Sequence, residues 1–183
     1  MLVVLVAAAA ASWHATTHER HALPRLQRTC RPQCGAVAVL CRQRFGCSEA
    51  AAQHTEAKLK HRAEYIDATM ANEKCDALQA RLGLSEAQLQ KVVAAHPAVL
   101  SYSFESNLEP KLGFLQAELV LSVDVLREKV LRQPASLGYS LERRYRPRLA
   151  ACHMAGVDVT LVMDRVAMTD KRFYASIGLG PEE

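Results

Sequence analysis

Residues 82–112, LGLSEAQLQKVVAAHPAVLSYSFESNLEPKL, decide the fold, because the chain repeats their pattern at residues 119–149, LVLSVDVLREKVLRQPASLGYSLERRYRPRL. The two stretches lie 37 residues apart, and 12 of the 29 positions in 84–112 are identical to their partners. Ordinary composition would give about two identities by chance. A fixed period between roughly 20 and 50 residues is typical of stacked repeat proteins, in which each unit buries its apolar face only against its neighbours.

Each repeat is predicted to open with a helix that ends at a proline. Ser85 is placed to cap the first helix, with Gln88 at the capping-box position. Pro97 ends that helix, because proline lacks an N–H and disfavours helical backbone at the residue before it. In the next unit, Ser122 and Pro134 hold the same two positions.

A shift of 36 residues reveals a third, incomplete copy that starts at Val157. Asp158 takes the place of the capping serine, and Asp170 stands where the closing proline is expected. We therefore expect a truncated third unit. Its apolar stripe is formed by Val159, Val162 and Val166.

After each proline, a short apolar turn ends near Tyr102 or Tyr139, and a second, longer helix follows. The side chains of its buried stripe recur at the repeat spacing, and residues 71–82 are interpreted as an additional half unit. Whether residues 104–109 form a separate turn before Pro110 stays open. The tyrosines are interpreted as core residues rather than base-stacking residues. The predicted stripe consists of Ala71, Cys75, Leu78, Leu82, Leu108, Leu112, Leu115, Leu119, Tyr145, Leu149, Cys152 and Gly156.

The positive charge of the chain is concentrated at its start. The net charge is +4. Residues 1–62 hold nine Lys or Arg and three acids, whereas residues 63–183 hold 14 Lys or Arg and 16 acids. A nucleic-acid function of the repeats therefore depends on where their basic side chains lie and not on the total charge.

The first 50 residues are predicted to be a targeting leader, largely disordered. Residues 2–11 form an apolar run too short to cross a bilayer, and an Arg-rich, acid-poor stretch follows. Together they resemble the bipartite leaders that carry proteins into plastids. A mitochondrial presequence is an equally supported alternative. Four cysteines in this region could bind zinc, but their spacing lacks the usual close pairs. These are Cys30, Cys34, Cys41 and Cys47.

Residues 51–73 are predicted to be a solvated helical lead-in, residues 74–179 the repeat domain and residues 180–183 a tail. The repeats resemble those of the mitochondrial transcription termination factor family, mTERF. The resemblance rests on the Leu-Gly-Leu-Ser opening, the closing proline, the Tyr-Ser step and the segment NLEPKL, and on MTDKRFYASIGL near the end. It covers about residues 74–179, although the array is shorter than is usual for the family.

The resemblance implies an all-α, curved helical-repeat solenoid in the matrix of a mitochondrion or plastid. It also implies binding of double-stranded DNA or structured RNA, in regulation or termination of organelle transcription. The alternative is a protein-interaction scaffold, or an RNA- or ribosome-associated factor with organellar transcription or ribosomal proteins as partners. We expect a monomer without a membrane segment.

The basic residues of the repeats are the candidate phosphate contacts. Four of them cluster at the start of one helix, and the opposing interpretation is a solvated face paired with Glu128 and Glu142. No glycine-rich phosphate loop or hydrolase motif occurs, so no catalytic residue, metal or cofactor is predicted. The candidates are Arg143, Arg144, Arg146, Arg148, Arg132, Arg127 and Lys111.

Overall fold

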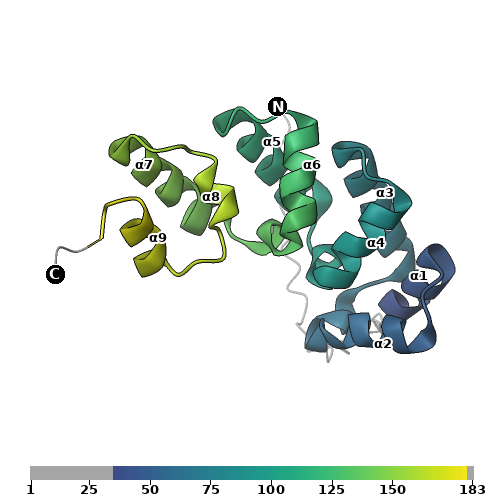
Figure 1. Ribbon diagram of the computed structural model, residues 1–183. Helices are drawn as coiled ribbons and strands as arrows, with labels where there is room; N and C mark the ends of the chain where they lie inside the picture. The colour runs from purple at the N-terminus through teal and green to yellow at the C-terminus, as the bar shows by residue number, and fades with distance from the viewer. Residues whose placement is uncertain (1–34, 181–183) are drawn as a thin grey trace, which may run out of the picture.

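A computed structural model describes residues 35–180, which form helices and turns without any strand. Successive helices lie next to one another in one extended row from α1 to α9 (Figure 1). This is the predicted all-α repeat solenoid. Equivalent positions recur at an offset of 37 and then 36, so we divide the row into unit A (47–83), unit B (84–120), unit C (121–156) and unit D (157–179).

Unit B shows the complete repeat. Helix α4 (Glu86–Ala95) is followed by the 3₁₀-helix η2 (Pro97–Ser101), the π-helical turn η3 (Phe104–Leu108) and helix α5 (Glu109–Glu118). Both bonds of the predicted capping box are present at the start of α4: the Gln88 backbone N–H donates to Ser85 Oγ, and the Ser85 N–H donates to the Gln88 side chain. Pro97 begins η2, which confirms that the first helix ends before it.

Unit C repeats this order with α6 (Val123–Arg132), η4 (Pro134–Gly138), η5 (Leu141–Tyr145) and α7 (Arg146–Ala155). In units B and C the π-turn runs directly into the following helix. Proline lacks an N–H and its ring clashes with the carbonyl four residues earlier, so Pro110 and Pro147 favour a wider turn before them. Residues 104–109 therefore belong to one continuous long helix.

The structure of residues 36–82 corrects three predictions. Residues 71–82 are not a half unit, because α2 (Glu49–Ala57), η1 (Lys60–Tyr65) and α3 (Ala68–Leu82) repeat the full order. Residues 36–50 are not disordered, because α1 (Ala36–Phe45) precedes α2 and buries its apolar side. The segment 51–73 is likewise more than a solvated lead-in, since it supplies core side chains. Those buried in these segments are Val37, Leu40, Cys41, Ala52, Leu59, Ile66 and Ala71.

Unit D is truncated, as predicted, and is also less regular. Its first helix is reduced to the single turn α8 (Leu161–Asp164), although Val162 and Val166 are buried as expected. The Asp158 carboxylate accepts the Thr160 N–H at the predicted capping position. The last helix, α9 (Asp170–Ser176), begins at the position that proline holds in units B and C.

The core is the predicted stripe of the long helices. Eleven of its twelve side-chain positions are buried, and the exception is Gly156. Cys75 and Cys152 are therefore core residues, as predicted. Tyr102 and Tyr139 are only half-buried, because each borders a gap between units. Within residues 35–180, no helix has the length and apolarity needed to span a bilayer.

Candidate nucleic-acid interface

A basic side chain at one repeat position connects each unit to the next. Lys74 Nζ donates to Leu100 O at 2.8 Å, and Lys111, 37 residues later, donates to Leu137 O at 2.5 Å. Both carbonyls lie in the 3₁₀-helix of the following unit. Lys111 is only 4% exposed. Lys111, predicted as a nucleic-acid contact, is therefore buried in this structure, where its ammonium group bonds to a carbonyl of the next unit.

Arg148 holds the same position in unit C and is 1% exposed. Its guanidinium lies 4.4 Å from the centre of the Phe173 ring and 2.8 Å from the Asp170 carboxylate. It joins unit C to unit D, so the guanidinium predicted to bind nucleic acid is bonded within the chain in this structure. Its remaining hydrogen bonds go to the backbone carbonyls of Arg165, Val166 and Met168.

Two more of the candidate arginines are partly buried and bonded within the chain. Arg144 donates to the carbonyls of Val166 and Met168, and its guanidinium stacks 5.0 Å from the centre of the Tyr139 ring. Arg127 pairs with Asp124 at 2.6 Å and lies within 3.4 Å of the Leu82 carbonyl at the end of α3. Both side chains position neighbouring elements, which limits how far they can reach toward a ligand.

The remaining candidates face solvent. Arg146 is exposed, paired with Glu142 at 2.9 Å and stacked 4.7 Å from the centre of the Phe114 ring. Arg132 and Arg143 are exposed, and within residues 35–180 neither side chain forms an ion pair or a hydrogen bond. The expected pairing with Glu142 thus applies to Arg146 alone. Exposed guanidinium groups without a carboxylate partner are suited to bind phosphate oxygens.

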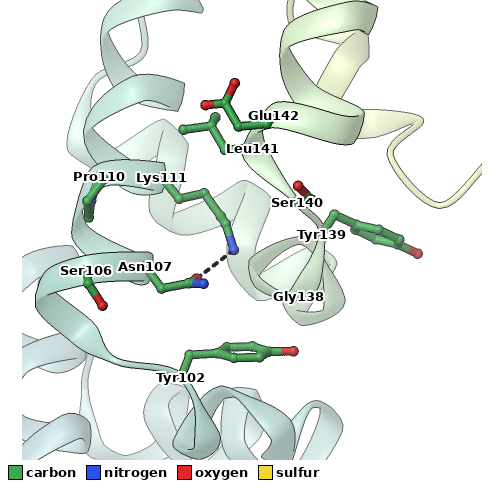
Figure 2. Close-up of a pocket in the computed structure, with 10 residues that line it drawn as sticks. All are labelled: Tyr102, Ser106, Asn107, Pro110, Lys111, Gly138, Tyr139, Ser140, Leu141 and Glu142. Atoms are coloured by element: carbon green, nitrogen blue, oxygen red, sulfur yellow. Dashed lines mark hydrogen bonds between the residues drawn. The ribbon is translucent and has the colours of Figure 1, made fainter.

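A cleft of about 460 Å³ lies between units B and C, and its lining includes Glu142, the residue before Arg143. We call it the B–C cleft, and Figure 2 shows its lining residues. Tyr102, Asn107 and Lys111 come from unit B, whereas Ser140 and Glu142 come from the start of the long helix of unit C. Lys111 reaches into the cleft and donates to Asn107 Oδ1 at 3.1 Å (Figure 2). Burial lowers the Lys111 pKa from 10.5 to about 8.

The recurrence of Tyr102 and Tyr139 was recognised from the sequence, but its extension to Tyr65 and a second, basic series were not. Tyr65, Tyr102 and Tyr139 lie 37 residues apart, as do Lys74, Lys111 and Arg148. The self-comparison that aligned units B and C contains both signals once it is extended upstream to unit A. The basic residue that recurs in units A, B and C bonds to the next unit each time, which indicates a structural role.

Two of the described cysteines, Cys41 and Cys75, are buried thiols. Burial raises the pKa of Cys41 to about 11 and that of Cys75 to about 12, so both remain thiols at neutral pH. In the part of the chain that the structure describes, no three His, Cys, Asp or Glu side chains converge as a metal site. Cys30 and Cys34 of the possible zinc set lie outside the described residues.

The row of helix–3₁₀–helix units defines an all-α helical-repeat protein with exposed arginines and a cleft between two of its units. A sequence model of the mTERF family matches residues 52–174, well over half of the chain, and the chain belongs to that family. The match extends from α2 into α9 and therefore includes parts of all four units. The family consists of organellar nucleic-acid-binding proteins with transcription-related roles, and its members are not known enzymes. No curated protein and no solved structure matches the chain.

Proposed function

We propose that this protein binds double-stranded DNA in an organelle and acts there in the regulation or termination of transcription. The observation that carries the proposal is the exposure of Arg132 and Arg143, without carboxylate partners in residues 35–180, in a member of the mTERF family. Arg146 contributes a third exposed guanidinium, because its ion pair with Glu142 is solvent-exposed and contributes little stability. Positive groups placed in this way bind phosphates without reading the base sequence.

The test compares duplex binding by the full chain and by the triple variant R132A/R143A/R146A across a range of salt concentrations. Each phosphate contact releases counterions, so losing up to three contacts lowers the slope of log affinity against log salt by about 2 to 3. The matched control is R42A/K60A/K91A, which removes the same charge from exposed positions in units A and B and in α1.

Unchanged affinity and slope in the first triple variant would refute the assignment of these arginines. An equal loss in both triple variants would mean that only the overall charge matters. Parallel titrations with structured RNA decide which nucleic acid is preferred, because duplex RNA presents its phosphates across a different groove geometry.

The second candidate is a protein-interaction scaffold in the same organelle. It is favoured by the small net negative charge of residues 63–183 and by the internal use of Lys111 and Arg148. Retention of the full chain on neither DNA nor RNA at low salt would support this candidate over the first.

A further inference from the structure

The three equivalent inter-unit positions differ in what surrounds their basic residue. At the A–B position, a cleft of about 120 Å³ is lined by Lys74 together with two carboxylates, Glu73 and Glu105. At the C–D position, Arg148 is bound by Asp170 and covered by Phe173. Only the B–C cleft combines a large open volume with a buried cation that lacks a carboxylate partner among residues 35–180.

The charge of Lys111 is not neutralised by the cleft itself. Its hydrogen bonds go to an amide oxygen and a backbone carbonyl, both of which are neutral acceptors. The one carboxylate in the lining, Glu142, points away from Lys111 and is paired with Arg146 (Figure 2). The positive charge of Lys111 also affects His96. Burial, and then this charge, lower the pKa of His96. A buried charge of this kind is costly unless an anion compensates it.

We infer that the B–C cleft binds the phosphate group of a small molecule about the size of a mononucleotide, with Lys111 as the main cationic contact. The volume of about 460 Å³ lies within the range of small-molecule sites. A phosphate offers several acceptor oxygens, and the lining provides several matching donors besides Lys111. These donors are the hydroxyls of Tyr102, Ser106 and Ser140 and the amide of Asn107.

Apolar side chains in the B–C cleft can contact the organic part of the ligand. The side chains of Pro110 and Leu141 line the cleft on the side opposite Tyr102, and the Tyr102 ring lies 5.6 Å from Lys111 Nζ. A duplex cannot bring its backbone to Lys111, because this residue is only 4% exposed and lines the cleft between two units. The site is therefore separate from the exposed arginines of the proposed function and does not depend on them.

The test titrates the full chain with AMP, inorganic phosphate, adenosine and malonate, using calorimetry and backbone-amide NMR. We expect AMP and phosphate to bind, adenosine to bind far more weakly, and the amide shifts to concentrate at Gly138, Tyr139 and Ser140. Replacing Lys111 with Met should lower the AMP affinity about tenfold or more, since a charge-assisted contact is lost. The matched control, Lys74→Met, removes the equivalent contact in unit A and should leave AMP binding unchanged.

The NMR map of the unmodified chain decides the question even if Lys111→Met fails to fold. No binding of AMP or phosphate, shifts away from the cleft, or an equal effect of both lysine variants would overturn the inference. Equal binding of malonate would overturn the choice of phosphate. Shifts produced only by DNA or RNA would overturn the small-molecule assignment. Unchanged duplex binding in R132A/R143A/R146A, with AMP binding retained, would leave this site intact while reducing support for the proposed function.

Discussion

Lys111 illustrates how one residue can have opposite interpretations in sequence and in structure. In the sequence it is one of several basic side chains near a helix start. In the structure its ammonium lies between two units, where it donates to the Leu137 carbonyl and to Asn107. What distinguishes it from Arg143 is its repeat position, which a basic residue also holds at Lys74 and Arg148.

This burial predicts a specific dependence of stability on pH. The pKa of Lys111 is about 8 in the folded chain and 10.5 in the unfolded chain, so between these values the unfolded state binds more protons. Stability should therefore rise as the pH increases from about 8 to 10.5, by an amount on the order of 2–3 kcal/mol. The measurement is urea denaturation at pH 7.5 and pH 10, for the unmodified chain and for Lys111→Met.

The variant lacks this titration, so the difference in unfolding free energy between the two proteins should shift in favour of the unmodified chain at high pH. A difference in unfolding free energy between the two proteins that stays the same at pH 7.5 and pH 10 would contradict the burial of a charged Lys111. Lys74→Met serves as the reference, because burial lowers the Lys74 pKa in the same direction at a more open position.

The helix ends show how the repeat imposes one backbone conformation on different residues. Gly46, Gly83 and Gly156 follow the long helices with φ of 61°, 62° and 63°, the left-handed conformation that ends a helix. At the equivalent position after α5, unit B has Val120, with φ of 50°. A β-branched residue is strained there, because its Cβ approaches the following carbonyl.

Replacing Val120 with Gly should therefore stabilise the protein by about 1 kcal/mol, with the relief of strain exceeding the extra flexibility of the unfolded chain. No packing is lost, since Val120 is 88% exposed. The matched control is Val125→Gly, which places glycine in the ordinary helical backbone of α6 and should destabilise by about 0.5–1 kcal/mol. Thermal and urea denaturation of both variants measure the effect. A loss of stability in Val120→Gly would show that the left-handed conformation is not strained.

Much of the element order could be predicted because serine caps and prolines mark it directly. Ser85, Pro97, Ser122 and Pro134 fixed the boundaries of units B and C in the sequence. Unit A was missed because Ala52 and Thr55 replace the larger Leu89 and Val92, and because Lys60 stands at the proline position. The apolar periodicity of α2 is therefore weak, although its cap and the Gly46 position match unit B.

The candidate interface was less predictable than the fold. A count of basic residues does not show which guanidinium groups find partners inside the array, and those partners come from distant positions. Arg148, for example, binds carbonyls that lie 17 to 20 residues away in the sequence. The exposed positions of Arg132 and Arg143 follow from which side of each helix packs on the next unit, which is a property of the assembled row.

At the scale of the whole molecule, the row begins with α1, which packs on α2, α3 and α4. Arg44, near the end of α1, extends this connection because its side chain bonds to Gln79 of α3 and to Glu86 of α4. Arg81 repeats the pattern one unit later, where it bonds to Glu109 and Gln116. Helix α1 therefore performs the same task as the last helix of a unit and covers the start of unit A.

This arrangement predicts where a targeting leader can be removed. A chain of residues 35–183 should match the full chain in stability, whereas a chain of residues 51–183 should lose about 4 kcal/mol or more. The loss reflects the burial of Val37 and Leu40, each about 1.5–3 kcal/mol, together with the bonds of Arg44. Urea denaturation of the two truncated chains measures the difference, and N-terminal sequencing of the protein isolated from cells should place the mature start before residue 36. Equal stability of the two chains, or a mature start inside α1, would mean that α1 is dispensable and that the row begins at unit A.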